Sequence, residues 1–313
     1  MTSPTPRDHG GGIDAACARW GGRPEDWLDL STGINPVPYP IPALAPSAWT
    51  RLPDRGAELA LIQAARAHWR VPDGVDILPA PGASAVIARL PMLRPAGQVH
   101  IENPTYNEHE AAFRAHGWAL SKKDADAVVL VNPNNPDGRT WPPTAADAPL
   151  VVIDESFCDI SPEASLIDLA RRPGTVVLKS FGKFWGLAGL RLGFAIGTGD
   201  TIGPLRDALG PWPCSGPALT IGTAALRDQN WASETRARLQ SDAGRLDTLL
   251  NPLGTIIGGT PLFRLLETPQ ASVLQERLAR NHIWTRTFPY APNWIRFGLP
   301  AVTGWGRLAD ALR

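Results

Sequence analysis

The sequence predicts an α/β fold, with a mostly parallel central sheet covered by helices and a smaller α+β unit after it. Two observations support this prediction. Apolar runs of strand length alternate along the chain with longer segments whose apolar residues recur at helical spacing. Two of the runs, residues 127–131 and 150–153, are apolar at every position and rich in β-branched residues. This composition is typical of strands that are buried on both faces, as in a parallel sheet.

The elements of the larger part follow in order from local patterns. Residues 58–69 are rich in Ala, Leu and Arg at helical spacing and predict the first long helix. The Pro-rich segment 36–53 before it is expected to be an ordered connecting arm, because Trp49 and Leu52 are embedded in it. The further expected elements are strand 75–78, helix 85–90, strand 99–101, helix 108–116, and strands 127–131, 150–153, 175–178 and 194–196.

The C-terminal part predicts a different arrangement. Residues 224–250 form one Arg-, Leu- and Ala-rich stretch, for which we expect a single long helix. The smaller α+β unit is expected from residues 255–266, a helix at 271–281 and a strand at 294–297. We therefore expect three parts: an N-terminal arm at 1–50 that belongs partly to the small domain, a large domain at 51–222, and a C-terminal small domain at 223–313.

Composition excludes several classes of function. The 30 basic and 30 acidic residues balance, so no net field would draw in nucleic acid or an anionic membrane. Apolar runs stay below the ~18 residues of a spanning helix, and residues 1–12 have no apolar segment typical of a signal peptide. Cys17, Cys158 and Cys214 lack metal-ligand spacing and are expected to be reduced, in the cytoplasm. The six scattered histidines likewise give no reason to expect a metal site.

Lys183 is the most informative residue of the chain. The sequence contains four lysines against 26 arginines, and Lys183 lies in a Gly- and aromatic-rich segment between the apolar runs 175–178 and 194–196. An arginine can neither lose its proton nor form an imine, whereas a lysine can do both. Ser180 and Arg191 flank it with a hydroxyl and a guanidinium, which can hold a phosphate. The segment therefore predicts a site for a phosphorylated aldehyde cofactor, with a surface loop lysine as the alternative.

Two further motifs follow expected strands. Gly82-Ala83-Ser84 lies between a strand and a helix, where backbone N–H groups can bind an anion, although many helices simply begin after Gly. Tyr106 follows the strand at 99–101 and can stack on a planar ring, or can belong to the core.

Asn135 and Asp154 follow the next two strands. Asn135 lies in a segment with two Asn-Pro steps, which predict a rigid turn and candidate cis peptide bonds. Its amide can donate to a ring oxygen, or the segment can be a turn alone. Asp154 ends a buried strand, where a carboxylate needs a partner. A protonated pyridine nitrogen would supply that partner, and metal binding or helix capping are the alternatives.

Arginines in the C-terminal unit are candidates for anion binding. Arg296 lies within the expected strand 294–297, where a buried guanidinium needs an anion, and a carboxylate would fit it bidentately. Arg286, together with His9 and Asn35 from the N-terminal part, is a candidate for a second anionic group. Each of these four residues taken alone is more often structural.

The order of these motifs resembles the class I/II aminotransferase superfamily of fold type I, whose members bind pyridoxal 5′-phosphate (PLP). The resemblance covers nearly the whole chain. It implies that Lys183 binds the aldehyde of PLP covalently, that Asp154 pairs with the pyridine nitrogen, and that Tyr106 stacks on the ring, so that these three residues are catalytic. It further implies that Asn135 bonds the ring hydroxyl. The residues that would hold the phosphate are Ala83, Ser84, Ser180 and Arg191.

The N-terminal part narrows the resemblance. Residues 9–12 followed by 29–36 resemble the threonine-phosphate decarboxylases of cobalamin synthesis, and histidinol-phosphate aminotransferases are the nearest competitors. Those aminotransferases usually have Tyr three residues after the pyridine-binding Asp, where this chain has Phe157, as the decarboxylases do. They usually also carry an arm Tyr that reaches the partner subunit's cofactor, where this chain has Leu52.

The resemblance implies a cytoplasmic homodimer that decarboxylates L-threonine O-3-phosphate to (R)-1-amino-2-propanol O-2-phosphate. Arg296 would anchor the carboxylate, and His9, Asn35 and Arg286 would hold the phosphate. Two alternatives remain: an aminotransferase of the histidinol-phosphate type, and a catalytically idle PLP-binding partner in corrinoid assembly. The sequence does not separate threonine phosphate from serine phosphate, because one methyl group is worth only about 1–3 kcal/mol of discrimination.

Overall fold

A computed structural model describes residues 9–313, which form two compact units. The larger unit is residues 38–234, and the smaller one combines residues 9–37 with residues 235–313. Helix α8 (Gln229–Leu250) passes along the chain from the larger unit into the smaller one. The domain borders at residues 50 and 222 that the sequence suggests stay a prediction.

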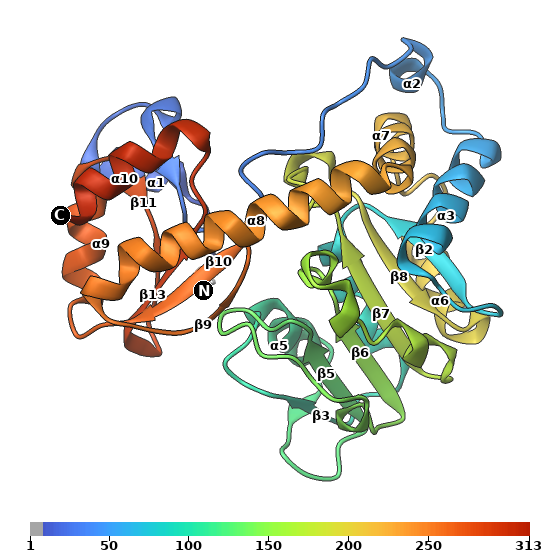
Figure 1. Cartoon of the computed structure of the whole chain (residues 1–313). Helices are drawn as coiled ribbons and strands as arrows, with labels where there is room; N and C mark the ends of the chain where they lie inside the picture. Colours follow the sequence, from blue (N-terminus) through green and yellow to red (C-terminus); the bar gives the residue numbers. More distant parts are fainter. Residues whose placement is uncertain (1–8) are drawn as a thin grey trace. The chain divides into compact units, whose positions relative to one another are not determined.

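A seven-stranded sheet forms the centre of residues 38–234, with the strand order β2-β8-β7-β6-β5-β3-β4 (Figure 1). Within this sheet β8 runs antiparallel to its neighbours β2 and β7, and the other pairs are parallel. The predicted mostly parallel α/β sheet is therefore confirmed. Its strands are β2 (Asp76–Ala80), β3 (Gln98–Ile101), β4 (Ala119–Leu120), β5 (Ala127–Val131), β6 (Leu150–Asp154), β7 (Thr175–Ser180) and β8 (Gly193–Gly197).

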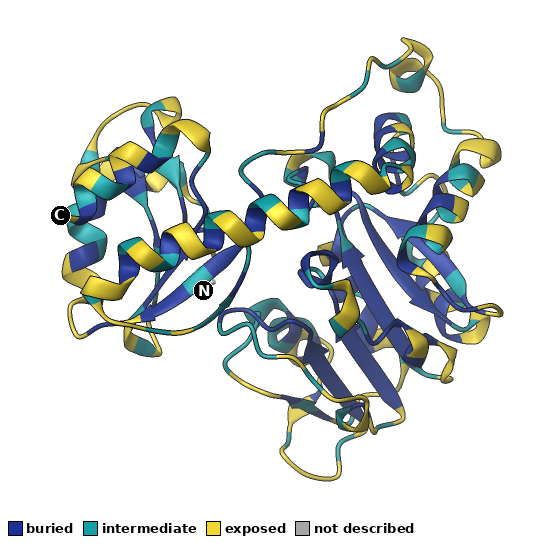
Figure 2. Ribbon diagram, in the orientation of Figure 1, coloured by how far each residue is buried: buried dark blue, intermediate teal, exposed yellow. Residues whose placement is uncertain are grey.

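Helices cover both faces of this sheet, and its central strands are buried along almost their whole length (Figure 2). The helices of the larger unit are α2 (Ser47–Thr50), α3 (Arg55–Trp69), α4 (Ala83–Ile87), α5 (Asn107–Ala115), α6 (Gly199–Leu209) and α7 (Gly216–Arg227). On one face α4, α5 and α6 contribute Val86, Phe113 and Ile202 to a core. Val152 of β6 and Leu178 of β7 belong to the same core, so side chains two positions away along these strands point to this face as well.

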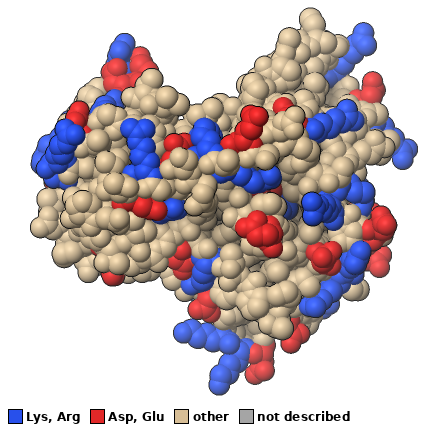
Figure 3. All heavy atoms as spheres, viewed as in Figure 1, with Lys and Arg blue, Asp and Glu red and all other residues tan. Residues whose placement is uncertain are grey.

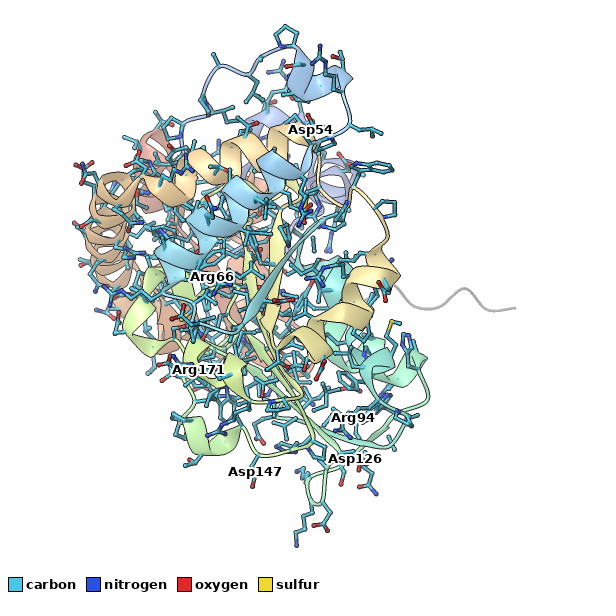
Figure 4. The ribbon with its side chains drawn as sticks, turned by 90° about the vertical axis from the view of Figure 1, so that its right-hand side faces the viewer. Asp54, Arg66, Arg94, Asp126, Asp147 and Arg171 are labelled. Carbon is cyan, nitrogen blue, oxygen red and sulfur yellow. The ribbon has the colours of Figure 1, made fainter. Side chains whose placement is uncertain are left out.

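Helix α3 packs on the opposite face of the sheet. Its Trp69 meets Phe194 of β8 edge to face at a centroid distance of 4.9 Å. Arg66, labelled in Figure 4, ties the helix to the segment that enters β2 by donating to the carbonyl oxygens of Pro72 (2.9 Å) and Val75 (2.5 Å). Helix α7 approaches α3 closely at Gly222, where an added Cβ would lie 3.0 Å from a methyl group of Leu61 on α3.

The long helix expected at 224–250 is wrong: the chain forms α7 and α8 with a break at Asp228. Asp228 has a ψ of 78°, which is not helical, and its carboxylate accepts a hydrogen bond from the backbone N–H of Trp231 at 2.9 Å. An Asp at this position caps a helix by bonding an N–H of its first turn, so α8 begins anew there.

The arm at 36–53 contains the short helix α2, and it is tied to the rest of the larger unit at Tyr39, whose N–H donates to the carbonyl of Trp185 at 2.9 Å. The apolar residues that suggested an ordered arm do not pack into a core of this chain. The side chains of Trp49 and Leu52 are 69% and 65% exposed.

The smaller unit has two sheets. Strands β1 (Leu28–Asp29) and β11 (Ile283–Trp284) pair in parallel. The other sheet is antiparallel, with the order β12-β13-β10-β9. Its strands are β9 (Thr255–Thr260), β10 (Phe263–Glu267), β12 (Arg286–Phe288) and β13 (Ala291–Gly298), and the helices of the unit besides α8 are α1 (Ile13–Trp20), α9 (Ala271–Arg280) and α10 (Trp305–Leu312).

The structure also bears on the expectations drawn from composition about surface charge, cysteines, membrane spans and metal sites. On the face shown in Figure 3, acidic and basic side chains are interspersed. Cys17, Cys158 and Cys214 are free thiols. Across residues 9–313, no helix is long and apolar enough to cross a membrane, and no group of three or more His, Cys, Asp or Glu side chains is arranged to hold a metal ion.

Candidate active site

A cavity of about 230 Å³ lies in the larger unit where β5, β6 and β7 end. Because these strands are parallel, their carboxyl ends meet at one edge of the sheet, which is where ligands bind in open α/β sheets. The eight residues that the sequence suggests for cofactor binding all line this cavity. Its lining consists of Ala83, Ser84, Ile87, Tyr106, Val131, Asn135, Asp154, Ser156, Phe157, Ser180, Gly182, Lys183, Ala188 and Arg191.

One end of the cavity is suited to an anion. The Arg191 guanidinium packs against the turn before α4, where Gly82 has a φ of 83° and an added Cβ would lie 2.5 Å from Arg191 Nη2. The hydroxyls of Ser84 and Ser180 line the same cavity. Helix α4 spans only five residues, so we attribute the capacity for a phosphate to these hydroxyls and the guanidinium, not to a helix dipole.

Asp154 is held at the end of β6 by two sets of donors. Its Oδ1 accepts hydrogen bonds from the backbone N–H (2.9 Å) and the hydroxyl (2.5 Å) of Ser156, and its Oδ2 lies 2.9 Å from Nε2 of His109. Burial alone would raise the pKa of Asp154. The hydrogen bond and charge of His109, together with the two bonds from Ser156, outweigh burial and hold this pKa below its ordinary value. The cavity therefore contains an ionised carboxylate.

His109 was missed by the sequence reasoning. It lies on α5, three residues after Tyr106, so both residues lie near one face of the same turn of chain. The two rings meet edge to face at a centroid distance of 6.0 Å. The Nδ1 atom of His109 has no hydrogen-bond partner among the described residues. The spacing of an aromatic residue and a histidine at the start of a helix was the signal that could have found it.

Lys183 lies in a tight loop between β7 and β8. Its backbone carbonyl accepts from the N–H of Gly186 at 3.1 Å, and the loop is closed by bonds from Phe181 N to Leu192 O (3.0 Å) and from Leu187 N to Phe181 O (3.1 Å). The Nζ of Lys183 lies 5.2 Å from the centre of the Phe157 ring. The amine is thus placed in the cavity by a loop whose backbone groups are paired.

The loops that carry Tyr106 and Asn135 are joined by the side chain of Asn134. Its amide nitrogen donates to the carbonyl of Pro104 (2.9 Å) and to Asp137 (2.7 Å), and its oxygen accepts from the hydroxyl of Thr105 (2.6 Å). The candidate cis bonds Asn132–Pro133 and Asn135–Pro136 are both cis, and Asn103–Pro104, which was not foreseen, is cis as well.

The four residues predicted to bind substrate all lie in the smaller unit. Arg296 is buried and donates to the carbonyl of Ser31 at 2.5 Å, and Arg286 is its partner residue in the β12–β13 pair. The side-chain oxygen of Asn35 accepts from Arg238 at 2.7 Å, whereas His9 is exposed. Their roles toward a substrate stay a prediction.

Residues 118–305 match the family described as aminotransferase class I and II, and the chain belongs to this family. It is 48% identical over 325 residues to a threonine-phosphate decarboxylase of Sinorhizobium sp, with 97% of both chains covered. It is 40% identical to a threonine-phosphate decarboxylase of Pseudomonas aeruginosa, again with 97% of both chains covered.

Solved structures show the same fold. The histidinol-phosphate aminotransferase of Sinorhizobium meliloti, in complex with pyridoxal-5′-phosphate, matches with a TM-score of 0.82 at 20% identity, over 99% of this chain and 94% of that one. The L-threonine-O-3-phosphate decarboxylase of Porphyromonas gingivalis matches with a TM-score of 0.75 at 19% identity, over 90% and 97%. The fold that the resemblance implies is therefore confirmed.

Proposed function

We propose that this protein is a PLP-dependent carboxy-lyase that converts L-threonine O-3-phosphate to (R)-1-amino-2-propanol O-2-phosphate in cobalamin synthesis. The observation that carries this proposal is the meeting of Lys183, Asp154 and Arg191 at one cavity. The two relatives at 48% and 40% identity are threonine-phosphate decarboxylases, and they match this chain over nearly their whole length. They support the choice of reaction.

The donor set of the cavity fits PLP. A phosphate would be held by Arg191, Ser84, Ser180 and the backbone at Ala83, an aldehyde by the amine of Lys183, and a protonated ring nitrogen by the carboxylate of Asp154. When bound, PLP supplies an electron sink for the electron pair that remains when the carboxyl group leaves.

Each residue then has a defined task. Asp154 would keep the proton on the ring nitrogen, since its depressed pKa leaves it negatively charged. Tyr106 would cover one face of the ring, and the amide of Asn135 would donate to the ring oxygen. We assign to Lys183 the return of a proton to the α-carbon of the substrate after CO₂ has left.

Substrate binding is proposed for residues of the smaller unit. Arg296 as a whole residue is 2% exposed, and we assign its guanidinium to the substrate carboxylate. Arg286, Asn35 and His9 are assigned to the substrate phosphate. Binding of that remote phosphate would orient the bond to the carboxyl group before it breaks.

We also propose a cytoplasmic homodimer. The exposed arm residues Trp49 and Leu52 support the dimer, because large apolar side chains exposed on the surface favour an interface. Leu52 would then replace a contact that the related aminotransferases make with Tyr.

The test is turnover in the absence of a keto acid. L-threonine phosphate is added to the purified, PLP-loaded protein, and CO₂ and aminopropanol phosphate are measured. We expect sustained release of both over many turnovers, and no release from a Lys183→Ala variant. Conversion of the cofactor to its amine form without CO₂ would instead indicate an aminotransferase, and no spectral change would favour an idle PLP-binding partner.

A further inference from the structure

A cluster of buried polar side chains lies on the α3 face of the sheet, behind the loop that carries Lys183. Its centre is Lys179, the fifth residue of β7, which is 2% exposed. The Nζ of Lys179 lies 2.6 Å from Glu155 Oε2 and 3.9 Å from Asp159 Oδ1. It also lies 5.6 Å from the centre of the Trp69 ring on α3. We call Lys179, Glu155, Asp159, Trp69 and Trp185 the lysine cluster.

The two carboxylates of the lysine cluster have neutral donors as well. Glu155 accepts from the hydroxyl of Ser165 (2.7 Å) and the backbone N–H of Leu166 (2.5 Å). Asp159 accepts from the indole N–H groups of Trp69 (2.7 Å) and Trp185 (2.8 Å). Each carboxylate therefore has two neutral donors in addition to the shared ammonium.

Lys179 remains charged in this environment. Burial would lower its pKa, but the neighbouring Glu155 and Asp159 carboxylates raise the pKa above its ordinary value. Replacing a buried ion pair by apolar residues of similar volume is often neutral or even stabilising. Stability alone therefore does not explain three buried charged groups at this place.

Two residues of the lysine cluster flank Lys183 in the sequence, one before it and one after it. Lys179 precedes Lys183 by four residues, and Trp185 follows it by two. The Trp185 ring is fully buried between two parallel rings, with centroid distances of 5.1 Å to Phe181 and 5.4 Å to Trp231. Its indole N–H is held by Asp159. Neither Lys179 nor Asp159 lines the cavity, so each reaches Lys183 indirectly, Lys179 through the backbone of the loop and Asp159 through its bond to Trp185.

We propose that Lys179 and Asp159 are positioning residues that fix the backbone before and after Lys183 and thereby aim its amine into the cavity. This inference rests on the proposed function of Lys183. A displacement of about 1 Å at a reacting group can cost on the order of 100-fold in rate. An ion pair on one side of the loop and an indole-to-carboxylate bond on the other limit such a displacement.

Four variants test the proposal. Lys179→Met and Asp159→Asn remove one charge each, Lys179→Arg keeps the charge, and Trp185→Phe keeps an aromatic ring in the stack but removes the N–H bonded to Asp159. Lys123→Met is the matched control, because Lys123 is exposed. In the PLP-loaded protein kcat and KM are measured. In the cofactor-free protein the rate of reductive methylation of Lys183 is measured by mass spectrometry, which is practical because the chain has four lysines.

We expect Lys179→Met and Asp159→Asn to lower kcat by about 10- to 100-fold with little change in KM, since misplacement affects the reacting groups and not substrate binding. The methylation rate of Lys183 should change in the same variants. Trp185→Phe should show both effects to a smaller degree, Lys179→Arg should restore much of the loss, and Lys123→Met should match the unaltered protein.

The outcomes separate this inference from the proposed function. Normal kcat and normal methylation of Lys183 in Lys179→Met and Trp185→Phe would overturn the positioning role and leave the decarboxylase intact. Failure of borohydride to fix PLP on Lys183 in the unaltered protein would overturn the proposed function, while the methylation rates would still report on the loop. If Lys179→Met does not fold, the conservative Trp185→Phe decides the question.

Discussion

Asp154 and Glu155 are adjacent in the sequence and both are buried, but they serve opposite faces of the sheet. Successive residues at the end of a strand point to opposite sides, so Asp154 reaches the cavity and Glu155 reaches Lys179. Asp154 has partners that keep it ionised beside a space open to a ligand. Glu155 has a full set of partners within the protein. Under the proposed function, one carboxylate therefore serves the reaction, and the other holds the structure that carries the site.

The first prediction tests the catalytic role assigned to Asp154. Asp154→Asn is nearly isosteric but removes the charge that would hold a proton on the ring nitrogen, so we expect kcat to fall by at least about 10²–10³-fold, the scale of losing a preorganised electrostatic partner. The free energy of unfolding should change by no more than about 1–2 kcal/mol, since neutral hydrogen bonds remain available. Turnover assays and urea unfolding measure the two effects, and a kcat within tenfold of the unaltered protein contradicts the assigned role.

The second prediction tests the structural role of Glu155. Glu155→Gln leaves the ammonium of Lys179 without its 2.6 Å partner, and we expect the free energy of unfolding to fall by about 3–5 kcal/mol, which is typical when one member of a buried pair is removed. The double variant Glu155→Gln/Lys179→Met should recover a large part of that loss, because no uncompensated charge remains. Urea unfolding of the single and double variants forms the cycle, and additive losses would show that the pair is not coupled.

The third prediction concerns pH. The pKa of Asp154 is depressed in the folded protein, so its ionised form stabilises the fold above the unfolded-state pKa, and this stability is lost as pH falls through the folded-state pKa. In cofactor-free protein, the loss of unfolding free energy from neutral to acid pH should therefore be smaller in Asp154→Asn than in the unaltered chain. Equal acid sensitivity of the two proteins would argue that His109 and Ser156 do not hold the carboxyl ionised.

Much of the larger unit could be predicted from sequence, and the reasons are physical. Residues 127–131 of β5 and 150–153 of β6 are apolar at every position, so the existence and type of these strands follow from the pattern alone. Asp154 and Asn135 could be picked out because they lie at or shortly after the carboxyl ends of these strands. The break at Asp228 was missed because Ala, Leu and Arg continue on both sides of it, and only the capping bond to Trp231 reveals a new helix start.

The lysine cluster was missed for a different reason. Lys179 stands next to Ser180 in the segment that drew attention to Lys183, and a lysine inside an apolar strand was visible in the sequence. Its partners were not, since Trp69 precedes it by 110 residues and is brought to it only by the packing of α3 on the sheet. His109 was hidden in the same way, because its bond to Asp154 joins α5 to β6.

The smallest expected effects come from a matched pair of serines that sharpens the comparison. The hydroxyl of Ser156 donates to Asp154 at 2.5 Å, and the hydroxyl of Ser165 donates to Glu155 at 2.7 Å. Replacing either by Ala removes one bond to a buried carboxylate, which is worth about 1.5–3 kcal/mol when the acceptor is charged.

The two changes should nevertheless differ in what they alter. Ser156→Ala acts on the carboxylate at the cavity, so we expect kcat to fall severalfold, with a small loss of stability because the backbone N–H of Ser156 still donates. Ser165→Ala acts on the face away from the cavity, and we expect the larger loss of unfolding free energy with a smaller change in kcat. Parallel turnover and urea measurements on both variants decide the matter. If the two variants changed kcat equally, the face of the sheet with Asp154 and the face with Glu155 would not have the separate catalytic and structural roles assigned here.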